Sequence, residues 1–389
     1  MKGGECNKKK VKNGIDFELP CSRRNFIKRM AVAVSSSMVG AGLIKPRSIM
    51  AVIPPLPEIN IGVFAPSHCT VPFVYTKLKG FFQEEKLRVN LINYPDMALI
   101  ANDLISGKLD FGQLIVPLVF AIHTGSKPFT SKTPMVITQI TGTNGAALMV
   151  RKGAGIINPL DFKGKTIVNH AKLSVHYLIN MMFLEKHGLD YQKSLNFRVI
   201  KLNKIVEALQ KSEVDAFIMP EPRDAMIEKL NLGEVYMLSK YIWPNHPCCG
   251  LVTRKAFFDK NSELVISVTR AMTKGGLLAN EAASREGMID LLQGAPRYKY
   301  NQLPRDVLRN AFTPGRSDFY PFPYQSAALV IIDLMKKYGL LSDHIDSGKL
   351  AGEVFLSHQS RRIMRELGAN PPESDYREER ILGNIRLYS

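Results

Sequence analysis

The feature that most constrains the fold is the alternation of buried-strand and helix patterns along residues 59–141. Residues 59–64 have the apolar run of a buried strand, whereas residues 71–86 carry apolar side chains at helical spacing. The series continues with predicted strands at 88–94, 111–116 and 134–141 and predicted helices at 97–107 and 118–124. Such a series folds most simply into a parallel sheet with helices on both faces.

A second series of the same kind begins after Gly153. Its predicted strands are 165–168, 197–202 and 214–219, and its predicted helices are 174–187, 205–211 and 223–230. From about residue 263 onward the pattern is mainly helical, with Pro-rich loops at 313–324, and Gly275-Gly276 inside a helical pattern indicates close packing or a kink. The sequence thus predicts an α/β fold with two lobes, each a mainly parallel sheet flanked by helices, and a helical C-terminal segment.

Residues 1–51 resemble a twin-arginine (Tat) export signal. A lysine-rich leader precedes Arg23-Arg24, Phe26 follows two positions later, and residues 31–44 are uncharged and small or apolar. A membrane anchor is the alternative, but it would need about 20 apolar residues, and Lys45 ends the run too early. We therefore predict cleavage near residue 51 and a periplasmic protein that depends on the Tat export machinery.

Charge and length narrow the class of protein that remains after cleavage. Loss of residues 1–51 would remove 11 of 52 basic and 3 of 35 acidic residues, which lowers the formal net charge from +17 to about +9. This excess is dispersed, and no arginine-rich or aromatic-interleaved stripe suggests nucleic-acid binding. The remaining 338 residues are more than one small core usually serves, which favours two lobes.

The cysteines and the missing catalytic motifs add two expectations. Cys69, Cys248 and Cys249 would remain in an oxidising compartment, and because three is odd, at least one is free, bound to a ligand or paired between chains. The chain contains no Gly-x-Ser-x-Gly elbow, no phosphate-binding Gly-rich loop ending in Lys-Ser/Thr, and no His-Glu-x-x-His. We therefore expect a protein that is not an enzyme and needs no cofactor.

Several short segments carry a family resemblance. The general ones are Lys79-Gly80-Phe81-Phe82-Gln83-Glu84-Glu85, Ser106-Gly107-Lys108-Leu109-Asp110, Asp161-Phe162-Lys163-Gly164-Lys165 and Glu213-Val214-Asp215-Ala216-Phe217. The more particular ones are Ile242-Trp243-Pro244-Asn245-His246-Pro247, Tyr320-Pro321-Phe322-Pro323-Tyr324-Gln325-Ser326-Ala327, and Arg365-Glu366-Leu367-Gly368 with Pro371-Pro372. With these segments, residues 58–383 resemble the solute-binding proteins of nitrate/sulfonate/bicarbonate-type ABC importers, and most of all the nitrate- and bicarbonate-binding branch.

The resemblance implies a two-lobed periplasmic-binding-protein-like fold of type II. Lobe one would comprise residues 58–147 and 245–389, and lobe two residues 148–244. The implied function is to capture a small-molecule solute and deliver it to an ABC permease in the membrane.

Topology also predicts where the solute binds. In open α/β sheets, ligands lie outside the carboxyl ends of the strands, which here selects the loops at 66–72, 94–97, 141–145, 170–176, 220–223 and 246–250. The ligand-binding candidates in these loops are His68, Cys69, Met97, Asn144, His176, Glu221, His246 and Cys249. Each also has a structural explanation: a cysteine can be a small buried hydrophobe, His176 can cap its helix, and Glu221 can pair with Arg223.

The resemblance is incomplete at the solute. His176 and Glu221 match the anion-contacting His and Glu of the nitrate and bicarbonate binders, but the Trp, Gln and Lys of that branch fall at Met97, Ala146 and Cys249. These differences would remove a cation and two planar donors from a site for a small oxyanion. We therefore expect a solute that is larger or less hydrated than nitrate.

A His/Cys cluster keeps two alternatives open. His246, Cys248 and Cys249 are the candidate metal ligands, with His68 and Cys69 across the cleft, because imidazole and thiolate bind Zn, Cu(I) or iron. The spacing His-Pro-Cys-Cys is not a standard zinc motif, and adjacent cysteines rarely chelate one ion well. The alternatives are a metal- or pyrimidine-binding protein, and an enzyme like the pyrimidine synthases of thiamine biosynthesis, whose longer cysteine cluster is missing here.

Overall fold

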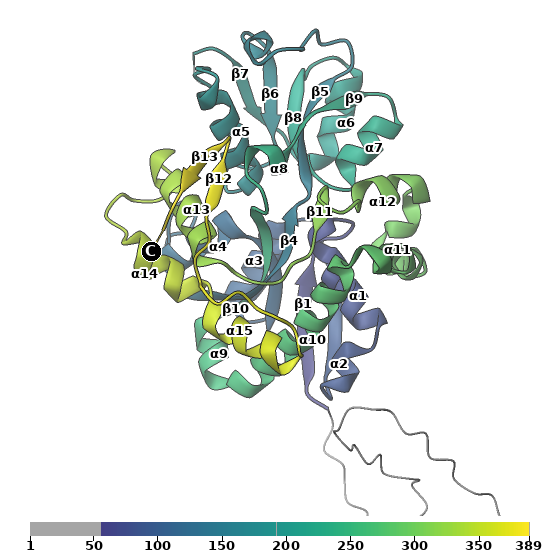
Figure 1. Ribbon diagram of the computed structural model, residues 1–389, viewed down its shortest axis with the longest axis vertical. Helices are drawn as coiled ribbons and strands as arrows, with labels where there is room; N and C mark the ends of the chain where they lie inside the picture. Colours follow the sequence, from purple (N-terminus) through teal and green to yellow (C-terminus); the bar gives the residue numbers. More distant parts are fainter. Residues whose placement is uncertain (1–55, 192, 389) are drawn as a thin grey trace, which may run out of the picture. The chain divides into compact units, whose positions relative to one another are not determined.

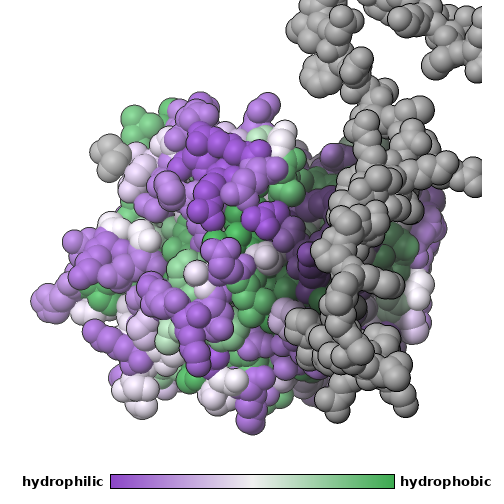
Figure 2. All heavy atoms as spheres, turned by 90° about the horizontal axis from the view of Figure 1, so that it is seen from below, coloured by the Kyte–Doolittle hydropathy of each residue, from purple (hydrophilic) through white to green (hydrophobic). Residues whose placement is uncertain are grey.

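The computed structural model describes residues 56–191 and 193–388 (Figure 1). The predicted Tat signal at 1–51 lies outside the described residues. Within the described part of the chain, no helix combines the length and the apolar character that crossing a membrane requires. On the face shown in Figure 2, hydrophobic residues lie among hydrophilic ones.

In these residues, a first sheet contains six strands in the order β11-β4-β10-β3-β1-β2. Their bounds are β1 (Glu58–Val63), β2 (Arg88–Asn93), β3 (Phe111–Ile115), β4 (Met135–Asn144), β10 (Pro247–Arg254) and β11 (Ser317–Asp318). β1 pairs in parallel with β2 and β3, whereas β10 is antiparallel to both β3 and β4. β3 and β4 are buried along their whole length, as expected of strands covered on both faces.

Helices from two distant parts of the sequence pack against this sheet. They are α1 (Val71–Leu78), α2 (Phe81–Glu84), α3 (Met97–Ser106), α4 (Val116–Thr124) and, from the C-terminal half, α9 (Lys255–Lys260) and α10 (Ser262–Asn280). The single helix predicted at 71–86 is wrong, because Gly80 adopts a left-handed conformation with φ 77° and separates α1 from α2. Gly275 confirms the predicted close packing: a Cβ there would lie 1.9 Å from Thr76 Oγ1, so α10 approaches α1 at van der Waals distance.

A second sheet among the described residues contains five strands in the order β7-β6-β8-β5-β9. Their bounds are β5 (Ala146–Arg151), β6 (Thr166–Asn169), β7 (Asn196–Val199), β8 (Ala216–Pro220) and β9 (Gly233–Leu238), and the helices between them are α5 (Val175–Lys186), α6 (Leu202–Gln210) and α7 (Arg223–Lys229). β6 pairs in parallel with β7 and β8, whereas β5 is antiparallel to β8 and β9.

The prediction of mainly parallel sheets therefore needs a correction. It is right for β1 to β3 and for β6 to β8, but both sheets are mixed, and β5, β9 and β10 were not predicted. β5 and β10, which were missed, each follow a segment that crosses from one sheet to the other. Each strand is therefore antiparallel to its neighbours. β5 follows β4 directly and β10 follows the short helix α8 (Ser239–Ile242), so neither is preceded by the long crossover that marks a parallel connection.

Two crossing segments join the sheets and lie side by side. β4 leads into β5 through Gly145, and β9 leads into β10 through α8 (Ser239–Ile242). Asn144, Gly145 and Asn245 all have positive φ, at 57°, 74° and 56°. Asn144 N donates to His246 O at 3.2 Å, and Asn245 N donates to Asn144 Oδ1 at 2.8 Å. The two crossing segments are thus hydrogen-bonded to each other at the residues with positive φ.

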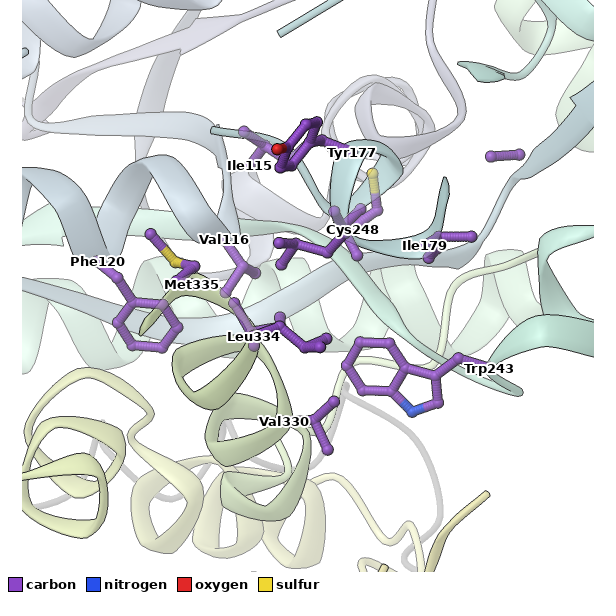
Figure 3. Packing of buried hydrophobic residues seen from close by; sticks show 14 of the residues in the cluster. Ile115, Val116, Phe120, Tyr177, Ile179, Trp243, Cys248, Val330, Leu334 and Met335 are labelled. Carbon is purple, nitrogen blue, oxygen red and sulfur yellow. The ribbon is translucent and has the colours of Figure 1, made fainter. Parts of the chain in front are cut away.

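The predicted helical C-terminal segment is confirmed. It comprises α11 (Arg285–Gln293), α12 (Arg305–Ala311), α13 (Gln325–Lys337), α14 (Ser347–Val354) and α15 (Ser357–Glu366), followed by the hairpin β12 (Glu379–Ile381) and β13 (Asn384–Arg386). The hairpin is tied to the second crossing segment, because buried Trp243 donates from Nε1 to Glu379 Oε2 at 2.8 Å. Figure 3 shows α13 side chains packed in one apolar cluster with α4, Trp243 and Cys248.

Candidate functional site

A cleft of about 1230 Å³ is lined by residues from both sheets. Its walls come mainly from loops that follow the carboxyl ends of β1, β2, β6, β7 and β8, as the topology predicts. Five of the six predicted loops contribute residues to the lining of the cleft. In the described part of the chain, the loop at 141–145 contributes none. This cleft is the candidate functional site.

The buried end of the cleft holds three thiols and two imidazoles from the described residues, which we call the Cys–His cluster: His68, Cys69, His176, Cys248 and Cys249. His68 Nε2 lies 3.2 Å from Cys69 Sγ. Cys248 Sγ lies 3.9 Å from Cys249 Sγ and 4.0 Å from His176 Nε2. Because η2 (His68–Thr70) and β10 pack with the first sheet and α5 with the second, the cluster is assembled from both sides of the cleft.

A β-bulge explains how adjacent cysteines come together. Neighbouring residues of a regular strand point to opposite faces of the sheet. Where β10 pairs with β4, however, the register shifts on both sides of Cys249, between Pro247 and Cys249 and between Cys249 and Gly250. Such a bulge bends the strand and redirects a side chain. Cys248 and Cys249 therefore both line the cleft.

Glycines of the first crossing segment make room for His68. A Cβ at Gly145 would lie 2.2 Å from His68 Nε2, and a Cβ at Gly142 would lie 2.7 Å from Cys69 Sγ. Gly145 also has a positive φ, which other residues rarely adopt. Because Gly142 and Gly145 have no side chains, the backbone of this segment can contact Cys69 and His68 directly.

Burial determines the charge of the imidazoles. It lowers the pKa of His68 and of His170 to about 4 and that of His246 to about 3. Burial, together with the neighbouring imidazoles, also holds the pKa of His176 well below its usual range. These rings are therefore neutral at neutral pH and can act as nitrogen donors.

The thiols differ from one another. Burial raises the pKa of Cys69, and the hydrogen bond with Cys249 raises that of Cys248. Burial also acts to raise the pKa of Cys249, but hydrogen bonds with Cys248, Cys69 and Gln113 outweigh it and lower the value to about 5. The cluster thus combines a stabilised thiolate with protonated thiols and neutral imidazoles, which is a soft donor set.

The remaining predicted site residues lie in different surroundings. Met97 is half-buried in the cleft wall at the start of α3. Asn144 belongs to the crossing segment, where its Nδ2 donates to Asp318 Oδ2 at 2.9 Å. His246 is buried beside Trp243 with Nε2 2.9 Å from Ser239 Oγ. The structure therefore does not bring His246 into one donor set with Cys248 and Cys249; His68, Cys69 and His176 take that place.

Two of the structural explanations offered for site residues are not the observed ones. His176 does not cap α5, because the Ser174 hydroxyl accepts from Tyr177 N at 3.1 Å. Glu221 pairs with Arg316 and not with Arg223: its Oε1 accepts from Arg316 Nε at 2.5 Å. Burial raises the pKa of Glu221, and Arg316 opposes that effect.

Glu221 holds the junction of the two sheets without lining the cleft. Its backbone N donates to Gly145 O at 2.9 Å, and its backbone O accepts from His68 N at 2.9 Å. Gly145 N in turn donates to Arg316 O at 2.8 Å. Glu221 thus positions the loop that carries His68.

A second carboxyl group at this junction leads to a prediction. Asp224 Oδ2 accepts from Ala147 N at 2.8 Å, and Oδ1 has no hydrogen-bond partner among the described residues. Burial, with the nearby Glu221, raises the pKa of Asp224 well above 3.8. Asp224 therefore stabilises the fold in its protonated form, and that contribution is lost as the pH rises through the folded-state pKa.

Asp224→Asn is accordingly expected to leave thermal stability unchanged at about pH 5 and to raise it relative to the parent at about pH 8, because the amide stays neutral and can still accept from Ala147. Thermal unfolding at both pH values measures the effect. The matched control is Asp306→Asn, where the hydrogen bond from Lys229 lowers the pKa of Asp306, so that loss of the charge destabilises at both values. A larger loss for Asp224→Asn at the higher pH would contradict the prediction.

Cationic side chains are the main part of the lining that was not predicted. The described lining includes Lys172, Lys201, Arg223, Arg297 and Lys299 but, of acidic residues, Asp96 alone. Asp96 caps α3 by accepting from Leu99 N at 3.0 Å. Arg297 and Lys299 come from the helical C-terminal segment, whose sequence carries no signal that it reaches the cleft. The excess of cations favours anionic solutes.

The chain is similar in sequence and in fold to known proteins. Residues 53–293 match the NMT1-like family. The chain is 26% identical to the nitrate import ATP-binding protein NrtC of Synechocystis sp., over 62% of this chain and 38% of that protein. It is 21% identical to the bicarbonate-binding protein CmpA of Synechococcus elongatus, over 61% of this chain and 57% of that protein. The chain thus spans less than two thirds of the length of these relatives.

Solved structures are similar over most of the chain. The periplasmic nitrate-binding protein NrtA from Synechocystis matches with a TM-score of 0.76 and 16% identity, over 84% of this chain and 94% of that one. A zinc-bound ligand-binding component of an ABC-type import system from Staphylococcus aureus matches with a TM-score of 0.67 and 18% identity, over 79% and 99%. These similarities confirm the predicted periplasmic-binding-protein-like fold.

Proposed function

Because the chain belongs to the NMT1-like family, we propose that it is the solute-binding component of an ABC importer of the nitrate/sulfonate/bicarbonate type. One observation carries the proposal: the cleft is lined from both sheets by loops at the carboxyl ends of strands. The lobes of the binding protein would be those predicted, residues 58–147 with 245–389 and residues 148–244, with the first boundary moved back to residue 145 because β5 (Ala146–Arg151) belongs to the second sheet. A solute held between them would favour the closed arrangement.

The proposal includes location and partners. Tat-dependent export would place the folded protein in the periplasm, where it would meet the permease of the importer. A nitrate import ATP-binding protein among its relatives supports an importer as the partner. The protein would release its solute chemically unchanged and would therefore not be an enzyme.

The cleft supports an organic anion as the solute. Its cations attract negative charge, while Phe64, Ile92 and Met97 add apolar surface to the wall. Nitrate and bicarbonate are small and strongly hydrated, so a site must replace their water with many donors. Neither Met97 nor Cys249 supplies the planar donor or cation found at that position in the nitrate- and bicarbonate-binding branch. A sulfonate or carboxylate with an apolar part fits this cleft better.

Titration calorimetry of the purified protein tests the proposal. Alkanesulfonates and organic carboxylates are expected to bind more tightly than nitrate and bicarbonate, and small-angle scattering should show a smaller radius of gyration with the bound solute. Arg223→Gln should weaken the best anion by about 10- to 100-fold, because hydrogen bonds to charged groups contribute about 1.5–3 kcal/mol.

The control for that variant is Lys260→Gln, which removes an exposed cation outside the cleft lining and should leave the affinity unchanged. Micromolar binding of nitrate or bicarbonate would contradict the assignment of the solute. Chemical conversion of the recovered solute, measured by mass spectrometry, would contradict a function in transport alone.

A further inference from the structure

The Cys–His cluster has a chemistry that the proposed function does not use. An organic anion needs cations and hydrogen-bond donors, which the outer lining supplies. Thiols and neutral imidazoles at the buried end of the cleft add little to anion binding. Their atoms are, however, the preferred ligands of soft and borderline metal ions.

Three ligand atoms of the cluster lie close enough together for one ion. A ring nitrogen of His68, Cys69 Sγ and Cys248 Sγ all lie within 4.8 Å of one another. Around a tetrahedral zinc ion, bond lengths of about 2.1–2.3 Å place the ligand atoms about 3.5–3.8 Å apart. The observed separations of 3.2 Å from His68 Nε2 to Cys69 Sγ and 4.0 Å from His176 Nε2 to Cys248 Sγ bracket that range. His176 is not one of the three residues within 4.8 Å of one another, but its Nε2 approaches the same Cys248 sulfur.

His176 gives an independent indication. Its side chain is buried in the cleft wall, and its Nδ1 has no hydrogen-bond partner among the described residues. The hydrogen-bond contact that its Nε2 makes within the described chain is the long one to Cys248 Sγ, at 4.0 Å. A buried imidazole with so little hydrogen bonding is unfavourable unless it has another function. Its ring contacts sulfur and the ring of His170, at a centroid distance of 5.0 Å.

We propose that His68, Cys69, Cys248 and His176 bind one thiophilic d10 metal ion, Zn(II) or Cu(I), at the buried end of the cleft. Two thiols lose their protons to solvent when the ion binds, and the S–H bonds are replaced by S–metal bonds. With Zn(II), the charges of the two ligand thiolates balance that of the ion, which suits a buried position. Cys249 then stays outside the ligand set, 4.0 Å from Gln113 Nε2.

This proposal does not rest on a function in import. A metal ion could bind whether or not the cleft also accepts an organic anion, because the two use different side chains. Since His176 comes from α5 and the other ligands from η2 and β10, the ion would also link the two sheets. Metal binding without binding of any organic anion would contradict only the proposed function.

Cobalt(II) is the spectroscopic probe for the site. The purified, reduced and metal-free protein is titrated under anaerobic conditions. One equivalent of Co(II) is expected to give thiolate-to-cobalt charge-transfer bands and the intense visible bands of tetrahedral coordination, and Zn(II) should abolish both. A parallel titration with Cu(I) against a chelator identifies which of the two ions binds more tightly.

Variants separate ligands from neighbours. Cys69→Ser and Cys248→Ser should each weaken binding by more than about 100-fold, because the loss of even an outer-shell partner weakens metal sites by about 10–100-fold. His246→Gln is the matched control, since His246 is a buried imidazole near the cluster that bonds to Ser239, and it should leave the bands intact. Circular dichroism of each metal-free variant checks the fold.

If a serine variant does not fold, alkylation of the parent protein decides the question. One equivalent of Zn(II) or Cu(I) should protect Cys69 and Cys248 from iodoacetamide, as counted by mass spectrometry. The proposal is overturned if the reduced protein, with its thiols titratable, shows neither charge-transfer bands nor protection by either ion. It is also overturned if Cys248→Ser retains the bands of the parent.

Discussion

Replacing Arg316 with methionine is expected to lower the free energy of unfolding by about 3–5 kcal/mol at neutral pH, because it leaves a buried carboxylate without its cation. Arg316 Nε donates to Glu221 Oε1 at 2.5 Å, and its Nη2 donates to Glu228 Oε2 at 2.6 Å. The Glu221 side chain is fully buried. After the substitution, its carboxylate would keep the N–H of Ala225 at 3.1 Å as its partner. Chemical denaturation measures the loss.

The pH dependence distinguishes this cause from simple loss of packing. Burial already raises the pKa of Glu221 above 4.5, and removal of Arg316 would raise it further. A carboxyl group with a raised folded-state pKa stabilises the fold at low pH, and this contribution is lost as the pH rises through that pKa. The Arg316→Met deficit should therefore be larger at about pH 8 than at about pH 5.

Two further variants serve as controls. Arg309→Met removes an exposed arginine whose Nη2 lies 2.8 Å from Glu286 Oε2, and surface ion pairs contribute little to stability. Adding Glu221→Gln to Arg316→Met should restore part of the stability, since a neutral amide is easier to bury. If Arg316→Met loses no more stability than Arg309→Met, the buried pair does not hold the junction.

Exchange of Arg23 and Arg24 for lysine is expected to abolish export almost completely. The proposed Tat address is read by a receptor, and lysine keeps the charge but not the planar set of donors that arginine offers. The precursor should then accumulate in the cytoplasm. Immunoblots of cytoplasmic and periplasmic fractions measure the distribution.

A matched double variant tests whether the arginine pair itself matters. Arg29 and Arg47 lie in the same predicted signal but outside the pair. Their exchange for lysine makes the same chemical change twice and should leave export intact. Equal periplasmic yields from both double variants would contradict the proposed Tat dependence.

Local patterns predicted much of the fold because they report burial and chain reversal. The apolar run at β1 reflects a strand covered on both faces, and Gly107 ends α3 with φ 87°, so both elements were predicted. β10 carries no such local signal. Its place between β3 and β4 depends on pairings with strands more than a hundred residues earlier in the sequence. Pairing partners of that kind cannot be read from periodicity.

The same limit applies to the site. Topology predicts which edge of a sheet a loop occupies, and this placed His68, Cys69 and His176 at the cleft. It does not predict the direction of a side chain within a loop, so Glu221 and His246 lie in predicted loops but face Arg316 and Ser239. The bulge at Cys249 depends on the register with β4, which the dipeptide Cys248-Cys249 does not encode by itself.

The hydrogen-bonded crossing segments have a mechanical consequence. The two segments are hydrogen-bonded to each other at Asn144, Asn245 and His246, so a change in the angle between the sheets bends them together. Residues at the ends of elements absorb the changes in φ and ψ that such bending requires. Cys248 lies two residues after His246, at the end of the second crossing segment. Any bend that separates the two sheets therefore moves the Cys248 sulfur relative to His176. Binding of a metal ion at these atoms and opening of the cleft would then be energetically coupled.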